Sequence, residues 1–344
     1  VAAVVQPSVA TDSQHEGDKE AGKEATAEPT ETVSREATGT SGFRNSGEVT
    51  SRVVSNWNGF VSALNDNSIQ NITISGNVVA TGDNGNTDNG RVNSVDRTVA
   101  INSQGRNVVI QGRNDQASLD LLSNSLKFTG SSAWNLVFKN LQLATGNSKG
   151  AVDLSSTTGA NTVTFENVKS QGSSLYGGGG NTDVIVKGET SSTVSDSYRS
   201  ANGQTQYVQR NVGSAGHSVL RREANIHDAK SVTVADGASL TLNRSSQGDG
   251  INLAGGSTVR VNDGASLTIN MNTDNGTESA RYHNAGIFME HGGTVVTGKD
   301  SKLTLNTSIG QAISLGMGRP ADGLTHLDRW GGYGTGNAFR RNGK

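Results

Sequence analysis

A nearly exact internal repeat constrains this chain more than any other feature of its sequence. Ala235–Asn243 reads ADGASLTLN and Asn262–Asn270 reads NDGASLTIN, so the copies differ only at their first and eighth positions. A looser third copy, KDSKLTLN, covers Lys299–Asn306. Repetition at a period of roughly 20–50 residues is typical of solenoids, propellers and other repeat arrays.

Each copy has the pattern of one solenoid rung. Alternating apolar residues such as Val232 and Val234 precede the Asp-Gly pair, and Leu240 and Leu242 follow it. One strand, a tight turn and a second strand cannot bury their apolar side chains alone, so successive rungs must stack. A β-propeller shares the period but needs blades of four antiparallel strands, and the regular hairpin turns that join them are missing here. The sequence therefore predicts an all-β chain folded as a right-handed parallel β-helix.

Strand-like segments of the same kind fill the chain upstream of the repeat, at spacings of roughly 22–30 residues between equivalent segments. These segments are Asn71–Ser75, Thr98–Asn102, Asn107–Gln111, Ser118–Leu122, Ser125–Phe128, Asn135–Phe138, Ala151–Leu154, Asn161–Phe165 and Thr182–Val186. Aromatic residues are 4% of the chain and apolar residues 32%, which fits a narrow column of small aliphatic side chains. Trp134, Phe138 and Phe165 are expected to lie in that column.

Two segments precede the rungs. Residues 1–48 hold nine acidic side chains among Ala, Thr and Ser with few large aliphatic residues, and such a segment cannot bury enough apolar surface to fold. We expect a disordered acidic linker at 1–48 and a ligand-binding β-solenoid at 49–344. Ser55–Leu64 has apolar residues at helical spacing behind a Ser/Asn cap, which predicts a short helix covering the N-terminal end of the solenoid.

Three segments interrupt the regular spacing of the rungs. They are Gly82–Arg97, Gly188–Lys230 and Met271–Asn284. Insertions in a solenoid become loops on one of its faces, where function is usually located. The second insertion and the third are separated by about two rungs, which is roughly 10 Å if both emerge on the same face.

The residues at the entrance of the solenoid resemble a known family. A lead-in rich in Glu, Ser and Thr, then WNGFVSALNDNSIQNITISGNVVATG at Trp57–Gly82, then rungs rich in Gly and Asn, are similar to the binding region of the serine-rich repeat glycoprotein adhesins of lactobacilli. These belong to the wider group of pectate-lyase-like solenoids. The long Ser repeats of that family are absent from this chain. The resemblance covers roughly residues 50–344 and implies a glycosylated, cell-wall-anchored protein that contacts host mucus or other polysaccharides.

Enzymes of the same fold cleave acidic polysaccharides, but their motifs are missing. The chain has no W-x-D-H or R-x-P-x-x-R stretch of a pectate lyase, and its Asn-Thr-Asp triplets are followed by no Asp-Asp, Gly-His-Gly or Arg-x-Lys. Asp236, Asp249, Asp263 and Asp322 each precede Gly, which is typical of a turn. A lyase or hydrolase acting on pectin-like polymers remains the alternative to an adhesin, and a purely structural surface stalk is a third possibility.

Basic and aromatic residues concentrate in the second and third insertions. Arg guanidinium groups bind carboxylates and sulfates through two parallel N–H donors, and Tyr rings stack on sugar faces. The candidate ligand-binding residues are Tyr198, Arg199, Arg210, Arg221, Arg222, Arg281, Tyr282 and His283. The competing interpretation is that these are solvated loop charges. The basic, aromatic tail at Arg329–Lys344 has three open interpretations, which are a capping turn, a second contact surface and a disordered exit.

The sequence offers little for other functions. Without Cys there is no disulfide or thiolate metal site, and the motif GGGGNTD at Gly177–Asp183 is out of register with a calcium-binding roll and predicts a flexible loop, so no metal or cofactor is expected. No apolar run is long enough to span a membrane. The net charge of −2 and the lack of a recognition fold argue against nucleic acid.

These observations predict an extracellular, non-enzymatic adhesin that binds acidic polysaccharide or mucin-type host glycans. The first residues are too short and uncharged for a signal peptide, so we expect targeting and cell-wall-anchoring segments outside this sequence. His217, His227, His283 and His291 lie in or beside the proposed site, and protonated histidines would strengthen binding of a polyanion near pH 5.

Overall fold

The structure is a computed structural model. It describes residues 50–81, 86–88, 91–93, 97–101, 103–208, 224–245, 248–271, 285–289, 293–307 and 311–315. The expected linker at 1–48 and the tail at 329–344 lie outside these residues. Within the described residues, no helix reaches the length and apolar character needed to cross a bilayer.

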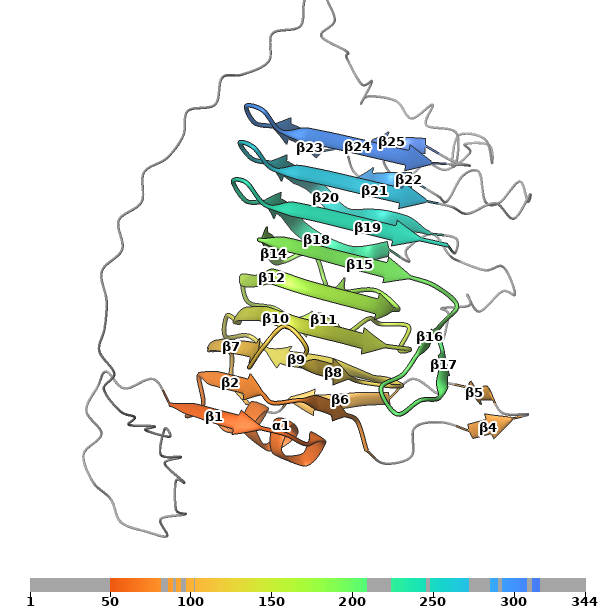
Figure 1. Cartoon of the computed structure of the whole chain (residues 1–344). Helices are drawn as coiled ribbons and strands as arrows, with labels where there is room; N and C mark the ends of the chain where they lie inside the picture. Colours follow the sequence, from red (N-terminus) through yellow and green to blue (C-terminus); the bar gives the residue numbers. More distant parts are fainter. Residues whose placement is uncertain are drawn as a thin grey trace, which may run out of the picture. The chain divides into compact units, whose positions relative to one another are not determined.

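The described chain is a stack of short parallel strands behind one helix, α1 (Trp57–Leu64) (Figure 1). The strands are β1 (Ser51–Val54), β2 (Asn71–Ile74), β3 (Asn77–Val79), β4 (Asn86–Asp88), β5 (Arg91–Asn93), β6 (Arg97–Ile101), β7 (Asn107–Gly112), β8 (Ser118–Asp120), β9 (Asn124–Gly130), β10 (Asn135–Thr145), β11 (Val152–Thr157), β12 (Asn161–Gly172), β13 (Tyr176–Gly177), β14 (Thr182–Lys187), β15 (Glu189–Val194), β16 (Ser197–Arg199), β17 (Thr205–Tyr207), β18 (Ala224–Val234), β19 (Ser239–Arg244), β20 (Asp249–Val261), β21 (Ser266–Met271), β22 (Ala285–Met289), β23 (Gly293–Thr297), β24 (Lys302–Thr307) and β25 (Gln311–Leu315).

All of these strands except β4, β5, β16 and β17 pair in three parallel ladders, which form the three sides of the stack. The first ladder runs β1, β2, β7, β10, β12, β14, β18, β20, β23. The second runs β3, β8, β10, β12, β15, β19, β21, β24. The third runs β6, β9, β11, β13, β18, β20, β22, β25. Three ladders of stacked parallel strands make a parallel β-helix, so the predicted fold is confirmed.

The long strands bend at a corner between the first ladder and the second. Asn140 in β10 and Asn167 in β12 lie there with positive φ angles of 49° and 53°, a conformation that Asn tolerates better than most residues. The Asn167 side-chain amide donates to that of Asn140 at 3.3 Å. Each bend lets one strand serve two ladders.

Aliphatic and aromatic side chains stack inside the column, as the sequence predicted. In the first ladder Ile72, Ile110, Phe138, Phe165 and Val186 occupy one register row, and all are 0% exposed. The Phe138 and Phe165 rings stack with centroids 5.5 Å apart. Trp134 is also buried, edge-on to Phe128. Each rung thus buries its apolar side chains against those of the next rung, which is how a solenoid is stabilised.

The helix α1 covers the N-terminal end of the column. Asn56 is its N-cap and accepts from the Gly59 backbone N–H at 2.8 Å, and the buried face is Trp57, Phe60, Ala63 and Leu64. The predicted capping helix is therefore confirmed, and it starts directly behind the expected Ser/Asn cap.

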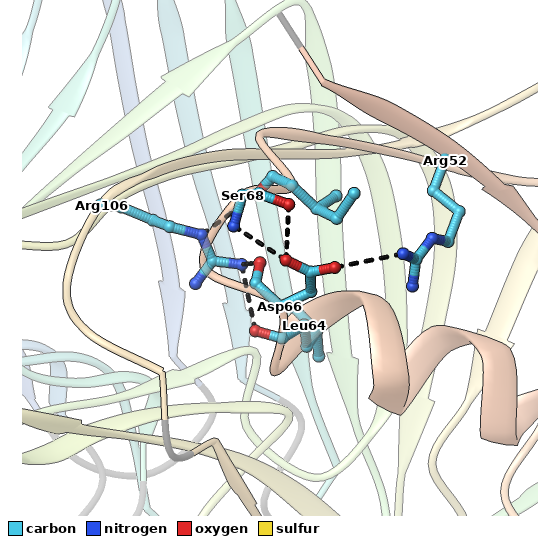
Figure 2. A network of polar contacts seen from close by, with 6 residues as sticks. Arg52, Leu64, Asp66, Ser68 and Arg106 are labelled. Carbon is cyan, nitrogen blue, oxygen red and sulfur yellow. Dashed lines mark hydrogen bonds and ion pairs between the residues drawn. The ribbon is translucent and has the colours of Figure 1, made fainter. Parts of the chain in front are cut away.

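A network of polar contacts fixes the end of this helix (Figure 2). The Arg106 guanidinium donates to the carbonyl oxygens of Leu64 and Asp66 at 3.1 and 2.9 Å, which satisfies carbonyls that a helix C-terminus leaves open. Asp66 accepts two hydrogen bonds from Ser68 and pairs with Arg52 at 3.2 Å. The Ser68 bonds, followed by Arg52, lower the pKa of Asp66.

Three expectations need correction. The second insertion does not begin at Gly188, because β15 (Glu189–Val194) is a regular strand of the second ladder. It also does not extend to Lys230, because Ala224–Lys230 belongs to β18, a strand of the third and first ladders. Asp249 is not a turn residue; it starts β20 and is 2% exposed. The segment Gly177–Asp183 is part of a regular rung, where the backbone N–H groups of Gly178 and Gly180 donate to the carbonyls of His227 and Asp228. By contrast, the Asp-Gly turns at Asp236 and Asp263 are as expected, with Gly237 and Gly264 at φ of 68° and 66°.

Candidate ligand-binding groove

The chain departs from the solenoid at the same end of the second ladder in each insertion. The strand β3 ends at Val79, β15 at Val194 and β21 at Met271. Val194 and Met271 both pair with Arg244, so these two exits are two strand spacings apart, roughly 10 Å. The solenoid therefore directs its insertions from one edge.

Parts of the first and second insertions form a small sheet of their own. Its strand order is β16, β17, β5, β4. The strands β16 and β17 are an antiparallel hairpin, as are β4 and β5, and Gln206 of β17 pairs with Val92 of β5. Figure 1 shows the β16–β17 hairpin, in green, extending from the end of β15 back toward the level of β8.

The β16–β17 hairpin is docked on β8 through one carboxylate. The Tyr198 hydroxyl donates to Asp120 Oδ1 at 2.7 Å, and the Ala201 backbone N–H donates to Oδ2 at 2.9 Å. Oδ1 also accepts from the Leu122 N–H at 3.1 Å. Burial, reinforced by the Asp120 carboxylate, raises the pKa of Tyr198 far above its ordinary value. Its hydroxyl therefore keeps its proton and continues to donate.

Two glycines on the solenoid make room for the hairpin. A Cβ at Gly172 would lie 2.8 Å from Cδ1 of the Tyr198 ring and 2.2 Å from the Thr145 carbonyl oxygen. A Cβ at Gly146 would lie 2.6 Å from the Tyr207 carbonyl oxygen. No side chain fits at these distances, so the hairpin packs directly against the rung backbone.

A groove of about 580 Å³ lies between the hairpin and the second ladder. Its floor is made of outward-facing residues in one register row, contributed in turn by β3, β8, β10, β12 and β15. These five residues are Asn77, Ser118, Gln142, Lys169 and Ser191. Gln171 and Thr193 line it from the next row, and Ser197, Tyr198, Arg199 and Ala201 form the wall. Hydroxyl and amide side chains are the commonest polar groups of this lining, and Leu119, Leu143 and Ala144 add apolar surface to it.

Two cations in the groove are available to a ligand. Within the described residues, neither the Lys169 ammonium nor the Arg199 guanidinium has a hydrogen bond or ion pair, and both residues are exposed. The one carboxylate among the lining residues is Asp120, which is occupied by Tyr198, Ala201 and Leu122. The free charge of this part of the groove is therefore positive.

The structure places two of the eight residues predicted to bind ligand. Arg199 is exposed on the hairpin and lines the groove, whereas Tyr198 is 6% exposed and its hydroxyl is bonded to Asp120. Tyr198 thus positions its neighbour Arg199. The remaining six lie outside the described residues: Arg210, Arg221, Arg222, Arg281, Tyr282 and His283.

Sequence reasoning missed the residues that the solenoid itself contributes. Lys169, Gln142 and Gln171 are outward positions of ordinary rungs, and Asp120 ends a short strand. Lys169 carried a usable signal, because a charged side chain between buried Val168 and Ser170 must point outward. Nothing in the local sequence of Asp120 indicates a partner 78 residues away.

The described residues show no metal site. They contain no group of three or more His, Asp or Glu side chains placed to hold a metal ion. In the described part of the chain, His227 Nε2 lies 3.4 Å from Asp228 Oδ2, on the third ladder rather than in the groove.

Comparison with known proteins agrees with this architecture. Residues 51–176 match the family described as "Putative pectate lyase-like adhesive domain". The SRRP (serine-rich repeat protein) of Lactobacillus reuteri 53608 aligns with a TM-score of 0.57 at 21% identity, covering 73% of this chain and 78% of that chain. The chain has the fold of the SRRP structures.

A second SRRP supports the same assignment. The SRRP of L. reuteri 100-23 aligns with a TM-score of 0.58 at 16% identity, covering 78% of this chain and 74% of that chain. No curated protein sequence matches the chain significantly. The resemblance to serine-rich repeat adhesins that the sequence indicated is thus confirmed, and the SRRP fold extends well beyond the residues that match the adhesive-domain family.

Proposed function

We propose that this chain is the ligand-binding region of a bacterial cell-surface adhesin and that it binds acidic polysaccharide or mucin-type glycans in the groove without cleaving them. The observation that carries the proposal is the groove itself, which combines two unpaired cations with a row of amide and hydroxyl side chains. The match of residues 51–176 to an adhesive-domain family and the SRRP fold support it.

The chemistry of the groove suits an anionic sugar polymer. A guanidinium binds a carboxylate or sulfate through two parallel N–H donors, and an ammonium adds a second point of positive charge. Gln142, Gln171 and the Ser and Thr hydroxyls can donate to and accept from sugar hydroxyls. Sugar hydroxyls need many such partners, which a groove lined by aliphatic side chains would not offer.

A hydrolase of the same fold finds little support in the groove. Glycoside hydrolysis by the usual route needs two carboxyl groups facing the scissile bond. Among the described lining residues Asp120 is the one carboxylate, and three hydrogen bonds from the protein occupy it. A purely structural stalk would have no use for a hairpin docked over a groove, so ligand binding is favoured over a hydrolase and over a stalk, and the product assay below tests a lyase.

The proposal is tested by binding to a glycan array and to polygalacturonate, with the double variant Lys169→Met/Arg199→Gln. We expect the variant to bind the acidic glycan at least about tenfold more weakly, because one charge-assisted hydrogen bond contributes roughly 1.5–3 kcal/mol. The matched control is Lys127→Met/Arg260→Gln, whose side chains lie on the third and first ladders. Equal binding by both double variants would place the site elsewhere, with the insertions and the tail as the next candidates.

Two further assays separate the alternatives. Release of unsaturated or reducing-end products from polygalacturonate would show an enzyme rather than an adhesin. Binding to no glycan on the array would favour the stalk. We also propose that binding is tighter at pH 5 than at pH 7.5 and that salt suppresses the difference, because protonation of histidines adds positive charge that attracts a polyanion. His227 lies on the third ladder, outside the groove, so this effect would come from His217, His283 and His291, which lie outside the described residues. Equal affinity at the two pH values would remove the histidines from the mechanism.

A further inference from the structure

The floor of the groove does not stop where the hairpin stops. The second ladder continues from β15 through β19, β21 and β24 with no shift of register. The row that contains Lys169 and Ser191 is extended by Thr241, Thr268 and Thr304. The row that contains Gln171 and Thr193 is extended by Asn243, Asn270 and Asn306. Polar side chains therefore continue the groove floor along the solenoid axis.

The asparagines of this extension are already ordered by one another. The Asn270 side-chain amide donates to Asn243 Oδ1 at 3.0 Å, and the Asn306 amide donates to Asn270 Oδ1 at 2.8 Å. The Asn243 amide reaches Thr193 Oγ1 at 3.4 Å, which joins the asparagine row to the groove. Each amide has two N–H donors and two lone pairs, so the ladder leaves one donor and one lone pair of Asn270 for a ligand.

The threonine row offers a second line of polar groups. Within the described residues the hydroxyls of Thr241, Thr268 and Thr304 make no hydrogen bond. Thr241 and Thr268 are half-buried and Thr304 is exposed. Their side chains are held by the rung spacing, so a ligand would meet them without a large cost in side-chain entropy.

The lengths of the groove floor and of its extension over β19, β21 and β24 fit a polymer. Stacked strands lie about 4.8 Å apart, so the five strands of the groove floor span about 19 Å and all eight strands of the ladder span about 34 Å. A sugar ring is comparable in length to one strand spacing. An array that repeats the same donors and acceptors at every rung suits a chain that repeats its own hydroxyls along the same axis.

We propose that the groove and the Thr/Asn rows of β19, β21 and β24 form one binding track for an internal stretch of a linear acidic polysaccharide, running along the solenoid axis. Acidic groups of the polymer are held beside the hairpin at Lys169 and Arg199, and hydroxyls of the following sugars lie on the Thr and Asn rows. This proposal rests on the proposed function and adds to it the polymeric nature of the ligand and its direction.

The test measures affinity against ligand length with oligogalacturonates of defined size. The parent protein is expected to bind longer oligomers progressively more tightly, beyond the length that the groove alone can hold. The critical variant is Thr241→Val/Thr268→Val, which removes two hydroxyls at nearly constant volume and leaves the asparagine ladder intact. The matched control is Thr233→Val/Thr258→Val, in which the same change is made at half-buried positions of the first ladder.

The two proposals fail in different ways. The critical variant is expected to bind long oligomers about fivefold more weakly, since each lost hydrogen bond contributes little binding free energy. It is expected to bind a disaccharide of galacturonate like the parent. If it binds every length like the control, the track ends at the groove and this inference is overturned, while loss of binding in Lys169→Met/Arg199→Gln would still support the proposed function. If those two groove substitutions also have no effect, the groove is not the site.

Discussion

The rungs of the solenoid and the β16–β17 hairpin are both built from short strands, but they are held in place in different ways. The strand β19 pairs with β15 and with β21 over six residues on each side, and its Leu240 and Leu242 are fully buried. The three-residue strands of the hairpin are held against the solenoid by hydrogen bonds to Asp120 and by direct packing on the backbone at Gly146 and Gly172. Repeated burial secures a rung, whereas a few specific contacts place the hairpin. A change in one region should therefore leave the other intact.

The largest expected effect comes from the rung core. Phe165→Ala removes a ring that is 0% exposed and stacked on Phe138, and large-to-small substitutions of this kind cost about 3–5 kcal/mol of unfolding free energy. Urea unfolding followed by circular dichroism measures the loss. Variant protein that remains folded should bind glycan like the parent. A loss below about 1 kcal/mol would mean that the stacked ring contributes little to the column.

A buried carboxyl group within the rungs should make stability depend on pH. Burial raises the pKa of Asp249 to about 7, against the opposing effects of hydrogen bonds from the Ala285 N–H and the Asn252 amide and of the nearby Arg244. The folded state then binds this proton more tightly than the unfolded state. Its stability falls as pH rises from about 4 to about 7 and levels off above that, by at most about 4 kcal/mol, because one pKa unit corresponds to about 1.4 kcal/mol.

The Asp249→Asn variant isolates this effect. An Asn side chain can still accept from the Ala285 N–H but carries no proton to lose in this range. We expect the parent to melt at a lower temperature at pH 8 than at pH 5, and the variant to show a smaller difference. The same difference in both proteins would assign the pH dependence to other groups.

A smaller and local effect is expected at the hairpin. Tyr198→Phe removes the hydroxyl that donates to Asp120, and one buried hydrogen bond of this kind contributes roughly 1.5–3 kcal/mol. Amide hydrogen exchange should speed up in residues 197–207, while the melting temperature of the solenoid stays unchanged. A lower melting temperature of the whole solenoid would show that the hairpin is part of the core, which would contradict the comparison above.

The same contrast explains what the sequence could predict. The rungs were predictable because Val232, Val234, Leu240 and Leu242 alternate around an Asp-Gly turn, and that local pattern decides which side chains point inward. The capping helix was predictable from the helical spacing of Trp57, Phe60 and Leu64. In both cases the physical cause lies within a few residues of the pattern.

The groove could not be predicted in the same way. Its wall depends on a contact between Tyr198 and Asp120, and its floor depends on which residues of distant rungs share a register row. Aromatic and basic residues in an insertion predicted a ligand site, but the Tyr198 side chain is buried between its own hairpin and the solenoid. Gly172 gave no signal either, because a glycine that makes room for the Tyr198 ring of the hairpin cannot be told by sequence from the many other glycines of the chain.

A crystal structure of the protein with a long oligogalacturonate tests the central claim most directly. The account predicts a sugar chain along the solenoid axis between the second ladder and the β16–β17 hairpin, with a carboxylate within hydrogen-bonding distance of Lys169 Nζ or the Arg199 guanidinium. Sugar units beyond the hairpin should lie over Thr241, Thr268 and the asparagine row. A ligand bound across the strands, or on the first or third ladder with the groove empty, would contradict it.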